Sequence, residues 1–140
     1  MHRPLAWRLS SRTLSLVALL ALGCAAPAGL PGWTRLGERT VSPRVERDVI
    51  AVGARAGRFE RVKLAVSGRA VTFHDVEVHY VDGTRQDVAL RQRVPVGGET
   101  RAVDLAGQDR RIARVVFVYE TVRTRDPRDP RAVVSLYGWR

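Results

Sequence analysis

The stretch AVTFHDVEVHYVDGTRQDVALRQRV (residues 70–94) decides the predicted fold of this chain. Apolar residues alternate with polar ones at positions 71 and 73, then continue one residue out of phase at 76, 78 and 80. Because side chains in a strand alternate between two faces, this slip predicts a β-bulge at His74–Asp75. The tripeptide DGT (82–84) predicts a hairpin with a type I′ turn, and residues 85–94 predict its return strand.

The same period of two runs through most of the remaining chain. It predicts further strands at 47–53, 59–67, 100–105, 111–121 and 132–139. About seven strands joined by short turns predict an all-β fold, a single antiparallel β-sandwich with a small β-barrel as the alternative. The segment RIARVVFVYET (111–121) is apolar on both faces, which predicts a central strand covered on both sides. The residues expected in or lining the core are Val62, Leu64, Val66, Val76, Val78, Val88, Leu90, Val116, Val118 and Leu136.

The N-terminus has the pattern of an export signal. A basic segment (1–12) precedes the apolar run TLSLVALLALG (13–23), which is too short to span a bilayer and predicts a signal peptide over 1–23. Cys24 follows in ALGC, which resembles the lipobox of bacterial lipoproteins and predicts lipidation of this cysteine. The alternative is ordinary cleavage after Ala28, which would remove it. Residues 24–43, rich in Ala, Pro and Gly, predict a flexible tether to a domain over 44–140.

These features place the chain in the cell envelope, as a periplasmic or outer-surface lipoprotein held to a membrane by its N-terminal lipid. If Cys24 is removed instead, the expected product is a soluble periplasmic or secreted protein. Cys24 is the single cysteine, so the sequence predicts no disulfide framework and no thiol chemistry.

The net charge is strongly positive, and arginine supplies almost all of the basic side chains. The chain has a formal charge of +10, and every basic residue except Lys63 is Arg, which favours anionic neighbours. Five arginines flank or begin the strand at 111–121 and form either an anion-binding rim or the solvated ends of the strand: Arg110, Arg111, Arg114, Arg123 and Arg125. Because acidic residues lie nearby in sequence, we expect a mixed-charge strand end that binds polyanions weakly and releases them near physiological salt.

Residue types that could perform catalysis are sparse. The segment HDVEVH (74–79) places Asp75, Glu77 and His79 on one strand face, but a metal site needs three or four converging ligands. The favoured interpretation is the polar face of an amphipathic strand, with a metal site as the weak alternative. No nucleophile elbow, P-loop or dinucleotide fingerprint occurs, so we expect no catalytic residue and no cofactor. A basic stripe interleaved with aromatic residues is also missing, which argues against a nucleic-acid partner.

From about residue 33 onward the chain resembles a family of small exported bacterial proteins of unknown function. The likeness rests on VGARAGRFERVKLAVSG (52–68), ETRAVDLAGQDRRIARVVFVYET (99–121) and LYG (136–138). The resemblance implies a secreted all-β domain and transfers no catalytic residue. The predicted function is a non-enzymatic envelope module that binds another protein or a glycan surface. The alternative is an envelope hydrolase or metal-dependent enzyme that uses strand 74–79.

Overall fold

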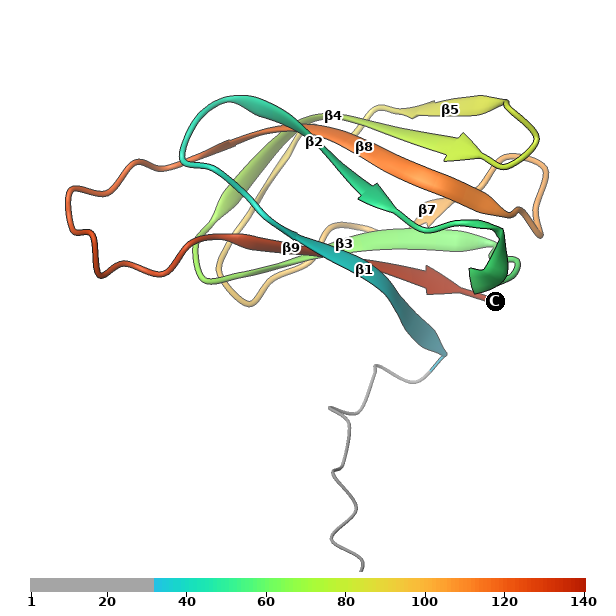
Figure 1. Cartoon of the computed structure of the whole chain (residues 1–140), viewed down its shortest axis with the longest axis horizontal. Coiled ribbons are helices and arrows are strands. Elements are labelled where there is room, and N and C mark those ends of the chain that lie inside the picture. The colour runs from blue at the N-terminus through green and yellow to red at the C-terminus, as the bar shows by residue number, and fades with distance from the viewer. Residues whose placement is uncertain (1–31) are drawn as a thin grey trace, which may run out of the picture.

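Two antiparallel sheets pack face to face in the computed structural model, which describes residues 32–140 (Figure 1). One sheet has the order β1 (Trp33–Thr40), β9 (Val133–Trp139), β3 (Arg61–Ser67), β7 (Val103–Asp104). The other has the order β2 (Glu46–Ala51), β8 (Ile112–Thr121), β4 (Val71–Tyr80), β5 (Arg85–Val88), and β6 (Gln92–Val94) also pairs with β4. The helical content of the described residues is one short 3₁₀ turn, η1 (Ala54–Ala56). The predicted β-sandwich is therefore confirmed, and the two separate sheets exclude the barrel.

The bulge in β4 is confirmed, and the turn that follows β4 differs from its prediction. The register of β4 against β8 shifts between Phe73 and Asp75, where the apolar phase slips. The predicted type I′ turn is wrong. Such a turn needs a positive φ at both central residues, and here only Gly83 has one, 88°. The Gly83 amide donates to the Tyr80 carbonyl (3.1 Å) and the Tyr80 amide donates to the Thr84 carbonyl (2.9 Å). This is a three-residue loop that combines a type I turn with a glycine bulge.

The predicted return strand at 85–94 is divided into two pieces. β5 pairs with β4 over Val76–His79 and β6 pairs with it over Val71–Phe73, on either side of the β4 bulge. Between them the Leu90 amide donates to the Val88 carbonyl (2.7 Å), which closes a local turn instead of a ladder bond. The side chain of Leu90 is nevertheless buried, as the alternation predicted.

The N-terminal boundary of the domain is where the sequence prediction fails. The tether predicted over 24–43 is wrong from Trp33 onward, because β1 pairs along its whole length with the last strand, from Trp33↔Trp139 to Thr40↔Val133. β1 is an edge strand with mostly exposed side chains, and a bulge between Arg35 and Gly37 interrupts its alternation. These two features remove the period that would have revealed it. The domain thus begins at Trp33 and not at 44, while Cys24 and the predicted signal peptide lie outside the described residues.

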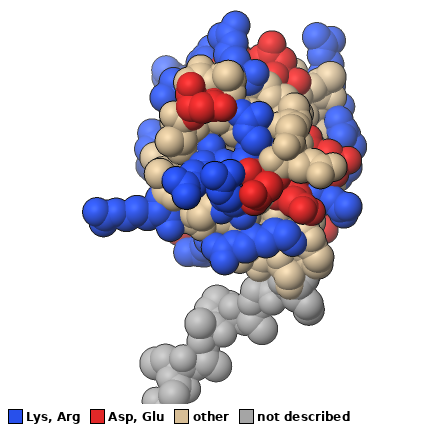
Figure 2. Space-filling model, turned by 90° about the vertical axis from the view of Figure 1, so that its right-hand side faces the viewer, with Lys and Arg blue, Asp and Glu red and all other residues tan. Residues whose placement is uncertain are grey.

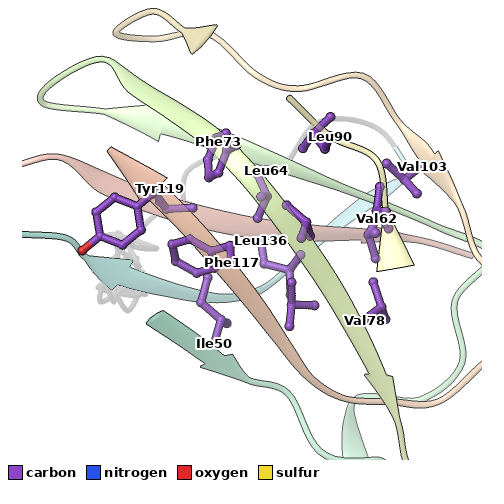
Figure 3. Close-up of a cluster of buried hydrophobic side chains, with 14 of the residues drawn as sticks. Ile50, Val62, Leu64, Phe73, Val78, Leu90, Val103, Phe117, Tyr119 and Leu136 are labelled. Atoms are coloured by element: carbon purple, nitrogen blue, oxygen red, sulfur yellow. The ribbon is translucent and has the colours of Figure 1, made fainter. Parts of the chain in front are cut away.

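The core lies between the two sheets (Figure 3). Phe117 of β8 is fully buried at its centre, with its ring centroid 6.0 Å from that of Phe73 and 5.5 Å from that of Tyr119. The predicted core residues found in this cluster are Val62, Leu64, Val66, Val76, Val78, Val88, Leu90 and Leu136.

β8 is central in its sheet, as predicted, but its two faces are not equally covered. Val115, Phe117 and Tyr119 point into the core, whereas Val116 and Val118 lie on the outer face. Val116 is buried by its neighbours in the sheet but does not belong to the core cluster, and Val118 is only half-buried. The core assignment of Val118 and the covering of β8 on both sides are therefore wrong, whereas Val116 is buried as predicted but lies on the outer side of the sheet. Within residues 32–140 no further layer packs on this outer face.

Lys63 departs from the simple alternation of β3. Its position predicts a solvated side chain, but the residue is only 6% exposed. Its ammonium lies 2.9 Å from Oε2 of Glu99 and 4.4 Å from the centre of the Trp33 ring. The cation therefore helps to hold the first residue of β1 against the sheet.

Candidate functional site

The five flanking arginines do not form one cluster. Arg110 and Arg111 precede β8, and Arg123 and Arg125 follow it, so ten strand residues, or roughly 30 Å, separate the two pairs. Figure 1 shows the β8–β9 loop at one end of the sandwich and the chain before β8 near the opposite end, where the C-terminus lies. A single anion-binding rim made of all five residues is therefore wrong, because a central strand runs between its two halves.

Arg110 has a structural role. Its guanidinium donates to Oδ2 of Asp82 (2.9 Å), Oγ1 of Thr84 (2.8 Å) and the Ala106 carbonyl (2.8 Å), and it lies 3.7 Å from the centre of the Tyr80 ring. These contacts fasten the β4–β5 hairpin to the turn before β8. Two hydrogen bonds from Thr84 lower the pKa of Asp82, and the charge and hydrogen bond of Arg110 add to this. Arg110 is thus fully engaged within the domain.

Arg114 lies on the outer face of the five-stranded sheet, beside the predicted metal-ligand types. Its guanidinium is 3.3 Å from Nδ1 of His79, whose Nε2 is 2.9 Å from Oε2 of Glu77, and Arg47 contacts the same oxygen at 3.3 Å. The hydrogen bond from His79 is the main reason that the pKa of Glu77 is lowered, and the positive charge of Arg47 adds to it. Asp75 lies further along this face and is exposed.

The strand at 74–79 does not assemble a metal centre in the described part of the chain. Among residues 32–140, no group of three or more His, Cys, Asp or Glu side chains converges in a way that could hold an ion. Glu77 and His79 instead contact one another and two arginines, and neither residue lines any of the four hollows described for the domain. The geometry here is that of a charged surface network.

A hollow of about 860 Å³ lies at the end of the sandwich away from Trp33. It is formed where the β1–β2 connection (41–45) meets the β8–β9 loop (122–132), and we call it the distal hollow. Its basic lining residues are Arg39, Arg44, Arg69, Arg123 and Arg131, and its acidic ones are Glu46, Asp48, Asp126 and Asp129. Arg123 was among the candidates from sequence, whereas Arg125 does not line the hollow.

A buried hydroxyl fixes one wall of the distal hollow. Tyr119 accepts a hydrogen bond from the Ser42 amide (2.9 Å) and donates one to Oδ2 of Asp48 (2.9 Å), while Nε of Arg39 holds Oδ1 of Asp48 at 3.1 Å. Burial raises the pKa of Tyr119 to about 12, and the carboxylate of Asp48 adds to this, although the Ser42 amide opposes it. The hydroxyl stays protonated at neutral pH and pins the β1–β2 connection to β8.

The arginines of the distal hollow differ in how far they are engaged. Arg69 donates to the Val122 carbonyl (3.4 Å) and to Oγ1 of Thr124 (3.2 Å), so it positions the β8–β9 loop. Arg44, Arg123 and Arg131 are exposed, and no carboxylate among residues 32–140 lies within ion-pair distance of them. These three guanidinium groups are open to an anion that enters the hollow.

A model of a protein family described as a domain of unknown function, DUF2541, matches residues 13–138. The chain belongs to this family. The match confirms the predicted resemblance to an uncharacterised domain family and extends from the sandwich back into the segment before it. Neither the curated proteins nor the solved structures yield a match. In the described part of the chain no helix is long and apolar enough to cross a membrane.

Sequence reasoning missed Arg44, Arg69 and Arg131 as site residues. These positions are far apart in the chain and meet only because β1 pairs with β9 and β2 pairs with β8. The available signal was the arginine content of each segment that joins two strands, but the sequence does not say which connections share an end of the sandwich.

Proposed function

We propose that the chain is an exported, lipid-anchored and non-enzymatic module of the cell envelope that binds an anionic glycan in its distal hollow. The observation that carries this proposal is the hollow of about 860 Å³ that contains three arginines without a carboxylate partner. Guanidinium groups bind carboxylate and phosphate with paired hydrogen bonds, and a polar cleft of this size fits a ligand of a few sugar units.

The remaining lining of the distal hollow suits a saccharide better than an apolar ligand. Ser42, Thr121 and Thr124 contribute hydroxyl groups, and Thr121 already donates to the Ser42 carbonyl at 3.0 Å. A sugar presents many hydroxyl groups of its own, which can exchange hydrogen bonds with such a wall. An acidic glycan would add the charge that the open arginines complement.

The charge balance indicates modest affinity. Five arginines and four acids line the distal hollow, which leaves a local excess of one positive charge. Binding should therefore weaken as salt rises, because exposed charges are screened over about 10 Å at 0.1 M salt. This agrees with the weak, salt-sensitive polyanion binding expected from the sequence.

The proposed anchor would determine which way the distal hollow faces relative to the membrane. A lipid on Cys24 would hold the Trp33 end of the sandwich near a membrane, and the hollow lies at the other end of β1. The ligand site would then face away from that membrane, toward envelope material. The enzyme alternative on strand 74–79 receives no support from this arrangement, because Glu77 and His79 are paired on a sheet face outside the hollow.

Binding to polygalacturonate, a polymer of carboxylated sugars, tests the ligand site. The wild type should bind it in low salt and should not bind neutral dextran. Reversing two open charges, with Arg44→Glu and Arg123→Glu together, should reduce binding at least about tenfold, since each reversed contact to a charge contributes roughly 1 kcal/mol or more. The matched control reverses two equally exposed and unpaired arginines at the other end, Arg55→Glu with Arg111→Glu. Equal losses in both double variants would reject the distal hollow as the site.

Mass spectrometry of the mature protein, together with cell fractionation, tests the anchor. The wild type should carry an acyl modification on Cys24 and remain in salt-washed membranes. A Cys24→Ser chain should lose both properties. A wild-type mature protein that begins after Ala28 would reject the anchor and leave the distal hollow to be judged by its own experiment.

A further inference from the structure

The end of the sandwich at which β1 begins carries a second, smaller hollow of about 470 Å³. We call it the tether-end hollow. Its charged lining residues are Arg55, Arg58, Arg111, Arg140, Glu60 and Asp109, an excess of two positive charges. Figure 2 views this end and shows basic side chains over much of it, with acidic ones between them.

Arg58 and Arg140 are engaged within the domain, whereas Arg55 and Arg111 are free to contact a ligand. Arg58 lies 3.6 Å from Oδ2 of Asp109, and Arg140 donates to the Ala56 carbonyl (2.9 Å) while it lies 5.2 Å from the centre of the Phe59 ring. Arg55 and Arg111 are exposed, and their side chains make no ion pair or hydrogen bond with the described residues. Their guanidinium groups are therefore the natural contacts for a phosphate.

Two tryptophans lie at the same end, on the outer face of the four-stranded sheet. Trp33 and Trp139 are register partners, half-buried, with ring centroids 5.5 Å apart in an edge-to-face arrangement. Lys63 lies against the Trp33 ring. Tryptophan combines a large apolar ring with one polar N–H, and it is enriched where protein meets the membrane–water interface.

The short segment between Cys24 and Trp33 would keep this end of the sandwich close to the membrane. This step rests on the proposed lipid anchor. Cys24 precedes Trp33 by nine residues, so the intervening chain reaches at most about 32 Å when fully extended and about 16 Å as a random coil. The distal hollow lies beyond the further length of β1, about 26 Å for its eight residues. The tether-end hollow is thus the arginine-rich surface that the anchor would bring to the lipid.

We propose that the tether end docks on anionic phospholipid head groups, with Arg55 and Arg111 at the phosphates and Trp33 and Trp139 at the interface. The docked domain stands upright, and its distal hollow points away from the membrane. The contact adds a second, reversible attachment to the acyl anchor, because a basic surface is attracted to an anionic leaflet only within about a Debye length.

Vesicle co-sedimentation of the mature chain from residue 24 tests this surface, with Cys24→Ser so that no acyl group is attached. At about 0.1 M salt the protein should bind vesicles of phosphatidylcholine with phosphatidylglycerol, and should not bind pure phosphatidylcholine. Arg55→Glu with Arg111→Glu should weaken this binding at least about tenfold. The control, Arg44→Glu with Arg123→Glu, makes the same charge change at the distal hollow and should stay within about twofold of the parent.

Three outcomes of the vesicle experiment alone would overturn the proposal. They are no binding to the anionic vesicles, equal binding to both vesicle types, and equal loss in the two double variants. Loss of polygalacturonate binding on reversal of Arg55 and Arg111, with vesicle binding unchanged, would assign this end to a glycan and also overturn it. Because acylation of Cys24 and the ligand site are measured separately, the docking surface can fail while the proposed function stands, and the reverse also holds.

Discussion

Replacing Tyr119 with Phe removes one buried hydroxyl and leaves the ring in the core. The hydroxyl accepts from the Ser42 amide and donates to the Asp48 carboxylate, both at 2.9 Å. A neutral hydrogen bond contributes about 0.5–1.5 kcal/mol and one to a charged group about 1.5–3 kcal/mol, so the sum is about 2–4.5 kcal/mol. Asp48 keeps its contact with Arg39, which places the expected loss at about 2–3 kcal/mol.

The raised pKa of Tyr119 determines how the stability of the domain changes with pH. Burial raises it from 10 in the reference state to about 12 in the folded domain. Ionising this hydroxyl therefore costs more free energy in the folded domain than in the unfolded chain. Since the folded pKa is the higher one, this stability is fully present below pH 10 and is lost as the pH rises through 12. The difference in unfolding free energy between wild type and Tyr119→Phe should therefore be constant up to about pH 9 and become smaller between about pH 10 and pH 12.

Urea denaturation followed by circular dichroism at several pH values measures this difference directly. At pH 7 the melting temperature of Tyr119→Phe should also fall by about 8–12 °C, at about 4 °C per kcal/mol for a domain of this size. The control is Tyr137→Phe, since Tyr137 lies half-exposed on the outer face of β9. It should change stability by less than about 0.5 kcal/mol. A Tyr119→Phe loss below about 0.5 kcal/mol, or a difference that does not change between pH 9 and pH 12, would refute the role assigned to this hydroxyl.

Three further substitutions test the core and the outer face. Leu136→Ala, at a fully buried position, should lower the unfolding free energy by about 2–5 kcal/mol in urea denaturation; a loss under about 1 kcal/mol would contradict its central place in the core. Gly138→Ala should cost about 1–3 kcal/mol in the same assay, because the added Cβ would lie 2.6 Å from Cδ1 of Phe59 and 2.9 Å from Cδ1 of Leu36. Ser135→Ala, on the half-exposed face of the same strand, is the control for both and should change stability by less than about 0.5 kcal/mol. Glu77→Gln should cost about 1 kcal/mol at neutral pH. Because the folded pKa of Glu77 is lowered, this loss should be fully present above the ordinary pKa of Glu and should fade as the pH falls through the lowered folded pKa; a loss that did not diminish on acidification would count against the Glu77–His79 pair.

The strands that could be predicted from sequence are those with one buried face, because burial of one face makes apolar and polar residues alternate along the chain. In β4 the slip from Phe73 to Val76 marks the bulge at its observed position, and in β8 the apolar run marks a central strand. The core face of β8 was misassigned, because both faces are apolar and periodicity alone does not say which one meets the other sheet. β1 was missed because an exposed edge strand with a bulge leaves no alternation to detect.

The candidate site was harder to predict than the core, because it depends on topology. Arg123 was recognised from its place after an apolar strand, but the side chains that share its hollow come from the β1–β2 connection and from the segments that flank β4 and β9. Arg110 illustrates the opposite error. Its place in an arginine-rich segment suggested an anion site. Its contacts with Asp82, Thr84 and Tyr80 instead connect the β4–β5 turn to the turn before β8.

The pairing of the first strand with the last has a mechanical consequence. β1 enters the domain at Trp33 and runs along β9 toward the distal hollow, so under the proposed function a pull between the anchor and a ligand in that hollow would act along the length of the strands. Under such a load the β1–β9 hydrogen bonds are sheared together, whereas a pull across the strands would open them one after another. If the proposed anchor and ligand are both present, this strand pairing would oppose tension between them.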